Sequence, residues 1–519
     1  MKQHDDERTT VSSRDDSTTM DLEKPLSSSN MTKSTSKQPT DSDDVLGVPR
    51  YGLHMTEDEL KLHKRVNFKM DVTILPLLSL LYLMNGIDRS NVGNAATSTF
   101  TQDVGMPKTA VNNAVTLFFI TFILFQPLSA AIGKRLGVRI WIPILMICWG
   151  TLTIAHAWTR NEGMLIGLRL MIGLFEAGFY ACSVYYLSSC YTRFDLAFRV
   201  ALFYGSYAVA GAFSGVLAYG LLQIGGTFHG WQWLFIVEGV LTVLLAIFAF
   251  FWLPTDMTSA WFLNSQERLW VQERMIRDSG GRDNTSKSLT RTDVVEALKD
   301  WKFWFVLPLN IAASTPSQSF SVFLPLITQG LGYTSYRANL FAVPIYVVGA
   351  FGLFIITWLS DRKQQRGWFI MVSLAFVFTG LVMVCLITSN QGRYASLCVL
   401  QIGGYAAPPL TVAWLANNTP DPGKRALILG MNGWGNVAGV AGAQLFRPAY
   451  APRYLIPFYV SLGLNVFAFV GYGLYRMLLW YVNRVRDRRT KNWTKQDWQM
   501  EEDNDERKGD NKLTFRYTL

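Results

Sequence analysis

Runs of about 20 apolar residues, separated by short charged segments, recur along most of this 519-residue chain. A run of that length crosses the hydrocarbon core of a bilayer as an α-helix, because the core is roughly 30 Å thick. Only helices and closed barrels satisfy every backbone polar group in lipid, and these runs lack the period-2 alternation of barrel strands. The sequence therefore predicts an all-α membrane protein.

Twelve runs are long enough to be transmembrane spans. They cover residues 70–93, 110–132, 140–158, 163–188, 199–222, 231–253, 303–328, 338–359, 367–388, 394–416, 425–446 and 454–481. The first contains Asp88 and Arg89, which we place near its non-cytosolic end. The seventh contains Pro308 and Pro316, which we expect to break it.

Basic residues gather in alternate loops between these spans. Loop 361–366 is one of the basic loops, and the loops between them are nearly bare of Lys and Arg. Because positive residues stay on the cytosolic side, both termini are expected in the cytosol. The net charge of +10 therefore reflects membrane topology. It does not indicate nucleic-acid binding, since no basic stripe is interleaved with exposed aromatics.

The longest polar segment between spans separates six spans from six, which predicts two helical bundles. Span five carries Gly211 and Gly215, and span eleven carries Gly435 and Gly439 at the same spacing, as expected for a duplicated architecture. The predicted organisation is a disordered cytosolic tail (1–65), an N-terminal six-helix bundle (66–253), a cytosolic central loop (254–300), a C-terminal six-helix bundle (301–483) and a cytosolic tail (484–519). Within the central loop, Glu267 to Arg277 is expected to form an amphipathic helix along the membrane surface.

Three segments carry a specific resemblance. Residues 359–367 read Leu-Ser-Asp-Arg-Lys-Gln-Gln-Arg-Gly, which resembles the cytosolic loop signature of the major facilitator superfamily. Residues 85–95, Asn-Gly-Ile-Asp-Arg-Ser-Asn-Val-Gly-Asn-Ala, and 169–179, Arg-Leu-Met-Ile-Gly-Leu-Phe-Glu-Ala-Gly-Phe, resemble the anion:cation symporters. That family includes fungal allantoate, nicotinate, pantothenate and cysteine permeases, and residues 191–205 are most similar to its cysteine and sulfonate branch.

The sequence departs from the family pattern at two places. Residues 134–139 lack the acidic residue of the loop signature, and Ala181-Cys182 stands where the family commonly has Pro-Gly. The resemblance implies a twelve-helix transporter whose cytosolic gating loop contains Asp361, Arg362 and Arg366.

Four ionisable residues within predicted spans indicate a polar pocket. A charged side chain at mid-membrane costs about 2.5–3.5 kcal/mol on insertion scales, so it usually faces a cavity. Arg169 and Glu176 are seven residues apart and share one helix face. The alternative for Arg169 is that it simply pairs with Glu176 or extends to the membrane–water interface. The alternative for Asp88 and Arg89 is an ordinary charge pair in an external loop.

The resemblance assigns roles to these residues. It implies that Asp88 and Glu176 carry protons, and that Arg89 and Arg169 bind the substrate anion. Tyr204 and Asn432 are further substrate-binding candidates, for which hydrogen bonding between helices is the alternative.

The function expected is proton-coupled uptake of a small organic anion or zwitterion, either a cysteine-like organosulfur compound or a carboxylate vitamin or nitrogen source. No catalytic or nucleotide-binding motif appears, so an enzyme is not expected. No spacing suggests a metal site, and no cofactor is expected. A transporter-like nutrient sensor is the alternative. We expect a monomer in the plasma membrane, although a vacuolar membrane would fit the sequence equally.

Overall fold

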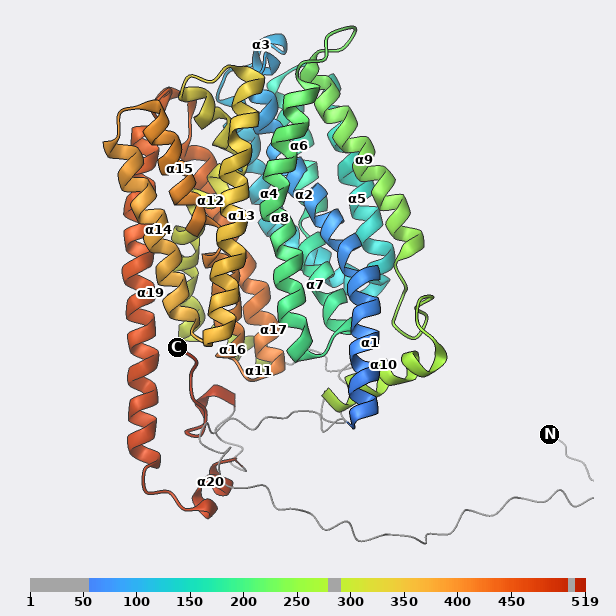
Figure 1. Ribbon diagram of the computed structural model, residues 1–519, viewed down its shortest axis with the longest axis vertical. Coiled ribbons are helices and arrows are strands. Elements are labelled where there is room, and N and C mark those ends of the chain that lie inside the picture. Colours follow the sequence, from blue (N-terminus) through green and yellow to red (C-terminus); the bar gives the residue numbers. More distant parts are fainter. Residues whose placement is uncertain (1–55, 279–290, 503–508) are drawn as a thin grey trace, which may run out of the picture. The chain divides into compact units, whose positions relative to one another are not determined.

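A computed structural model of the chain describes residues 56–278, 291–502 and 509–519 (Figure 1). The helices belong to one compact unit, Leu53–Leu519. Secondary structure in these residues is helical, as predicted, and ten helical segments are long and apolar enough to cross a membrane. The predicted disorder of residues 1–55 lies outside the described part of the chain.

The first half of the unit contains the helices of the predicted N-terminal bundle. They are α1 (Glu57–Thr73), α2 (Leu75–Ala96), α4 (Ala110–Leu136), α5 (Val138–Ala155), α6 (Glu162–Glu176), α7 (Phe179–Cys190), α8 (Arg193–Leu221) and α9 (Gly230–Trp252), with the short α3 (Phe100–Asp103) and the 3-10 turn η1 (His156–Trp158) between them. All six predicted spans of this half meet the length and composition of a membrane helix.

The second half contains the C-terminal bundle. Its helices are α12 (Trp301–Gly330), α13 (Ser335–Lys363), α14 (Arg366–Leu386), α15 (Asn390–Gly404), α16 (Ala407–Asn417), α17 (Pro422–Met431), the 3-10 segment η3 (Asn432–Asn436), α18 (Val437–Leu445) and α19 (Leu455–Thr490). Four of its six predicted spans are among the ten segments, and the exceptions are α12 and the α17–η3–α18 run. Both exceptions are helical at the predicted positions, and the count of twelve crossings stays a prediction.

The seventh predicted span is not broken by its prolines, contrary to expectation. α12 is a single helix of 30 residues with Pro308, Pro316 and Pro325 inside it. Proline is tolerated in a buried membrane helix because neighbouring helices and Ser or Thr hydroxyls satisfy the freed carbonyls. The carbonyl of Ser321, which Pro325 leaves free, accepts a hydrogen bond from the hydroxyl of Ser90 on α2 at 3.0 Å.

Helix breaks occur instead in spans four and ten. α6 ends at Glu176 and α7 begins at Phe179, while α15 ends at Gly404 and α16 begins at Ala407. The two breaks lie six spans apart, as expected for a duplicated architecture. At the first break, a side chain on Gly178 would come within 1.9 Å of the hydroxyl of Ser129 on α4, so the close helix contact requires glycine.

The predicted tail boundary at residue 65 is wrong, because α1 already begins at Glu57. Thr56 and Glu59 form a reciprocal capping box at its start, which satisfies two orphan donors of the first turn. The boundary at 483 is also displaced, since α19 continues to Thr490 and is followed by α20 (Lys495–Glu502).

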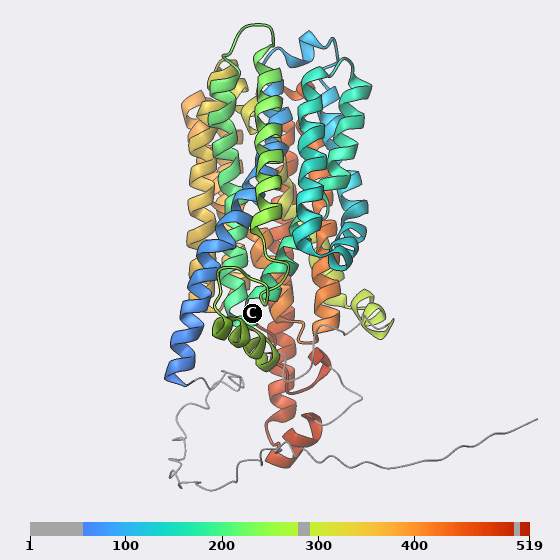
Figure 2. The same ribbon diagram turned by 90° about the vertical axis from the view of Figure 1, so that its right-hand side faces the viewer.

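The predicted central loop 254–300 contains α10 (Ser265–Asp278) and α11 (Arg291–Leu298), so the helix expected at 267–277 is confirmed. α10 packs on the N-terminal bundle through buried charged side chains. Arg274 donates to the side chain of Asn67 and to the carbonyl of Cys190, each at 2.7 Å, and Glu267 binds Lys69 at 2.7 Å. α1, α10 and α20 lie at one end of the bundles and α3 at the other (Figures 1 and 2).

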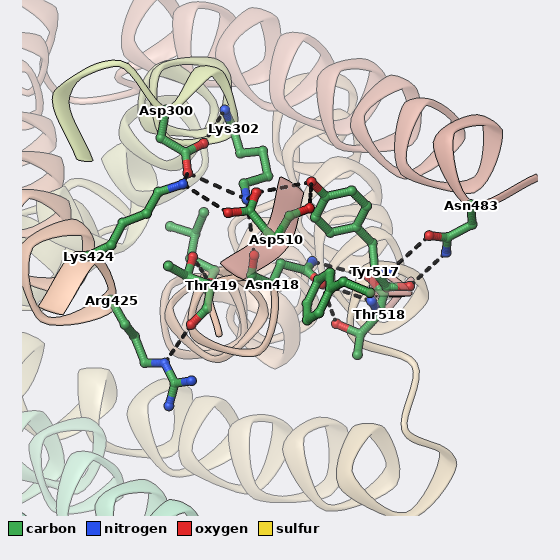
Figure 3. Close-up of polar contacts among 12 residues, drawn as sticks. Asp300, Lys302, Asn418, Thr419, Lys424, Arg425, Asn483, Asp510, Tyr517 and Thr518 are labelled. Atoms are coloured by element: carbon green, nitrogen blue, oxygen red, sulfur yellow. Dashed lines mark hydrogen bonds and ion pairs between the residues drawn. The ribbon is translucent and has the colours of Figure 1, made fainter. Parts of the chain in front are cut away.

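The segment 509–519 folds back onto the C-terminal bundle at the end that carries α20. Its Asp510 lies between Lys302 and Lys424 (Figure 3). Lys424 also pairs with Asp300 at 2.7 Å, and Tyr517 donates to Asp510 at 3.1 Å. These contacts join α12, α17 and the C-terminal segment through buried charges that are mutually paired.

We expect Asp510→Asn to destabilise the protein near neutral pH by roughly 1.5–3 kcal/mol, the value of hydrogen bonds to charged groups. Burial alone would raise the pKa of Asp510, but the ammonium groups of Lys302 and Lys424 hold it below its usual range. Its stabilisation is therefore complete above the unfolded pKa of about 3.9 and is lost as pH falls through the lower folded pKa. Melting temperatures of the two proteins should differ at pH 7 and converge under strongly acidic conditions; an equal difference at both would contradict this assignment.

Candidate functional site

An ion pair between two different helices forms the centre of the site. Nε of Arg89, on α2, lies 3.1 Å from Oε2 of Glu176, the last residue of α6. Both side chains are buried. The guanidinium of Arg89 also lies 4.6 Å from the ring centre of Phe122 and 5.7 Å from that of Tyr207, so aromatic faces stabilise its charge.

Asp88 precedes this arginine and points to another helix. Its Oδ1 accepts hydrogen bonds from Thr153 on α5 at 2.7 Å and from Asn91 at 3.2 Å. Its Oδ2 has no hydrogen-bond partner among the described residues. The carboxyl groups of Asp88 and Glu176 are close enough to interact, so the two predicted proton sites belong to one cluster.

Arg169, on α6, has the least satisfied side chain of the predicted set. It is 2% exposed, and Nη1 donates to the backbone carbonyl of Asp88 at 3.4 Å. Nε and Nη2 have no partner in the described chain. A buried guanidinium with unused donors is costly, because each lost hydrogen bond to a charged group is worth about 1.5–3 kcal/mol.

A small cavity separates the two arginines. Its volume is about 10 Å3, close to the least space that holds one water molecule. Arg89, Val115, Phe118, Phe119, Arg169 and Val322 line it. Val322 belongs to α12 and the others to the N-terminal bundle, so the site lies where the two bundles meet.

Close packing of α6 against α4 positions Arg169 and Glu176. A side chain on Gly173, between them, would lie 2.4 Å from the carbonyl oxygen of Phe118. The break after Glu176 ends α6 at this carboxyl group. The sequence segment predicted to carry the chemistry thus forms the terminus of a discontinuous helix, a recurrent feature of transporter sites.

The other two predicted substrate-binding residues lie outside this cluster. Tyr204 belongs to a group of packed aromatic rings. Its ring centre is 6.4 Å from that of Tyr207, and Tyr207 in turn faces Arg89. Asn432, on η3, accepts a hydrogen bond from Asn310 on α12 at 3.2 Å. This contact is a hydrogen bond between two helices of the C-terminal bundle, which is the alternative role given above for Asn432.

The predicted gating loop connects α13 to α14. Asp361 forms an ion pair with Arg366, the first residue of α14. Arg362 instead lies over the ring of Trp358, at 5.4 Å from its centre. The loop is therefore held by contacts among its own residues and the adjoining helix ends.

Sequence reasoning missed Glu238, on α9, and His156, on η1. Glu238 is 3% exposed and interacts electrostatically with Asp88 and Arg169, and His156 is fully buried and interacts with Arg169. Glu238 is the only charged residue between Trp231 and Leu253. The signal used for the other four residues, a charge within an apolar span, would have found it.

The bundles are joined at the end that carries α3. Asn112, near the start of α4, donates to the carbonyls of Ala443 and Phe446 at 2.7 and 3.0 Å. Thr97, just after α2, accepts from Gln329 at 3.3 Å and from Asn339 at 3.0 Å. Two further hydrogen bonds join the bundles in the same half of their interface, from Ser90 to the carbonyl of Ser321 and from Gln444 to Thr116. The bundles therefore close the site at this end.

Comparison with known proteins identifies the fold family. The model of the family described as Major Facilitator Superfamily matches residues 78–443, which include every residue of the cluster. The chain belongs to the major facilitator superfamily. It is 34% identical over 439 residues to the MFS-type transporter efuF of Hormonema carpetanum, covering 83% of this chain and 88% of that protein.

Two further relatives are named as transporters. The high-affinity nicotinic acid transporter of Saccharomyces cerevisiae is 32% identical over 408 residues, covering 78% of this chain and 76% of that protein. The major facilitator-type transporter hxnP of Emericella nidulans is 34% identical over 400 residues, covering 75% and 80% respectively. The chain is therefore a multi-pass membrane transporter and not an enzyme.

Solved structures of the superfamily share this fold. A D-xylose-proton symporter superposes with a TM-score of 0.61 at 14% identity, covering 77% of this chain and 97% of that one. A bacterial homologue of the human lysosomal transporter Spinster superposes with a TM-score of 0.58 at 16% identity, covering 78% and 96%. The expected all-α major facilitator fold is confirmed.

Proposed function

We propose that this transporter is an anion:cation symporter that imports a small organic anion together with protons across the plasma membrane. The observation that carries the proposal is Arg169, a buried guanidinium with two nitrogen atoms that have no partner in the described chain. A carboxylate or sulfonate would satisfy these donors in a bidentate geometry. The substrate would thus supply the bonds that Arg169 lacks.

Nicotinate is the first substrate to test. It is small, planar and monovalent, and a relative that is 32% identical is named as a nicotinic acid transporter. The aromatic side chains around Arg89 offer faces on which a flat ring next to a carboxylate can stack once the bundles separate. Cysteine and small sulfonates remain the second class to test, because of the resemblance of residues 191–205 to their transporters.

Proton coupling follows from the exchange of partners at Arg89. In the closed cluster Glu176 forms an ion pair with Arg89 at 3.1 Å. A proton on Glu176 removes that pairing, so Arg89 becomes available to the substrate anion beside Arg169. When the proton leaves towards the cytosol, the ion pair re-forms and displaces the anion. Each cycle therefore moves substrate and proton in the same direction.

Uptake of labelled compounds tests this proposal. The chain is expressed in yeast lacking the corresponding transporters, and labelled nicotinate, cysteine, taurine, pantothenate and allantoate are offered at acidic and neutral external pH. We expect acid-stimulated accumulation of one compound above its external concentration. Surface-expressed protein that accumulates none of them at either pH would contradict the proposal and favour a sensor.

A further inference from the structure

Glu238 has no role in the coupling scheme above, although it lies against the same cluster. It sits one helical turn after Phe235 on α9, and neither of its carboxyl oxygens has a hydrogen-bond partner in the described chain. Its side chain is 3% exposed. α9 packs closely on α5 here, since a side chain on the adjacent Gly239 would come within 2.7 Å of the carbonyl oxygen of Gly150.

An ionised carboxylate in this environment would be unusually costly. Moving a charge from water into a protein interior without donors costs several kcal/mol even after relaxation. The other two carboxyl groups of the cluster have donors: Glu176 accepts from Arg89, and Asp88 accepts from Thr153 and Asn91. Glu238 is therefore the acid least able to carry a negative charge in this conformation.

The charge balance of the cluster leads to the same residue. Asp88 on α2 and Arg169 on α6 interact electrostatically with Glu238, while α5 has no charged residue after Arg139 and α8 none after Arg199. The carboxyl, guanidinium and imidazole groups of the cluster are those of Asp88, Arg89, His156, Arg169, Glu176 and Glu238. With His156 neutral, three carboxylates exceed two guanidinium groups by one negative charge, and one proton makes the cluster neutral.

We propose that Glu238 holds this proton in the closed state and is a third proton site of the transporter. Its role in coupling rests on the proposed symport, but its protonation does not. When the site opens to the cytosol and the substrate leaves Arg169, water reaches Glu238, and the carboxyl group loses its proton and becomes a partner for Arg169. The proton then leaves on the side to which the site is open.

Infrared spectroscopy of the purified transporter, in a detergent without ester groups, tests the protonation directly and without any substrate. A protonated carboxylic acid has a carbonyl-stretch band that a carboxylate lacks. We expect such a band at neutral pH in the wild type, its loss in Glu238→Gln, and its retention in Glu162→Gln, a glutamate at the start of α6 outside the cluster. Absence of the band from the wild type, or an undiminished band in Glu238→Gln, would overturn the proposal.

A second variant covers the case in which Glu238→Gln fails to fold. Glu238→Asp keeps the carboxyl group but moves it by one methylene, so its band should persist at a shifted frequency. An unshifted band would assign the proton to another residue and overturn the proposal.

Transport measurements test the coupling role of Glu238 separately from the proposed symport. Each coupled proton contributes about tenfold to the accumulation ratio per pH unit of gradient. Glu238→Gln should therefore lower pH-driven nicotinate accumulation about tenfold for each pH unit of gradient. Exchange of labelled for unlabelled nicotinate should stay intact. An unchanged accumulation ratio would overturn the coupling role of Glu238. If wild-type protein transports no nicotinate, the symport proposal fails while the infrared result still decides where the proton lies.

Discussion

Arg169→Gln is expected to weaken substrate binding more than any other single substitution in the cluster. Removing one partner of a buried charge-assisted contact costs about 2–5 kcal/mol, and 1.4 kcal/mol is tenfold in affinity. We therefore expect apparent substrate affinity to fall by about 30-fold to several thousand-fold. Concentration-dependent uptake of whichever compound the wild type accumulates measures this change, and surface labelling confirms equal expression.

Arg160→Gln is the matched control, because Arg160 is exposed just before α6 and only nine residues from Arg169. It should transport like the wild type. Arg169→Lys should recover part of the lost affinity, since an ammonium keeps the charge but not the bidentate fork. Wild-type affinity in Arg169→Gln would refute the assignment of this residue to the substrate.

Glu176→Gln is expected to remove one coupled proton from the transport cycle. The amide resembles a permanently protonated acid, so Arg89 stays available to the anion in both orientations of the transporter. Uphill accumulation should fall about tenfold for each pH unit of gradient, while exchange of labelled for unlabelled substrate persists. Both are measured in the same proteoliposomes, with and without a pH gradient.

Glu162→Gln provides the control for this substitution. Glu162 accepts a hydrogen bond from Asn113 at 3.2 Å at the start of α6, away from the arginines. Its replacement should leave the pH dependence unchanged. If Glu176→Gln accumulates substrate as steeply as Glu162→Gln, Glu176 carries no coupled proton.

A single kind of signal in the sequence located four residues of the cluster. Asp88, Arg89, Arg169 and Glu176 are charges within apolar runs, and the cost of burying charge in a membrane predicts that such residues share a polar site. Their partners could not be predicted in the same way. The sequence suggested pairs within each helix, whereas Arg89 pairs with Glu176 across two helices, because tertiary packing decides which side chains meet.

The errors in the predicted fold have local causes. α1 begins earlier than expected because the capping residues Thr56 and Glu59 lie within a polar segment, where composition alone suggests disorder. α12 stays continuous because its neighbours compensate for its prolines, and a single sequence does not reveal those neighbours. The positions of α9 and α14 were predicted closely, since their apolar runs are long and end at clear turns.

Simultaneous measurement of substrate and proton movement tests the central claim most directly. Purified transporter is reconstituted into liposomes that contain a pH indicator, and an inward gradient of the transported anion is applied without a pH gradient. Symport predicts acidification of the lumen that follows substrate entry, and fewer protons for each substrate molecule that enters in Glu176→Gln. Substrate entry with no change of luminal pH in the wild type would contradict the account.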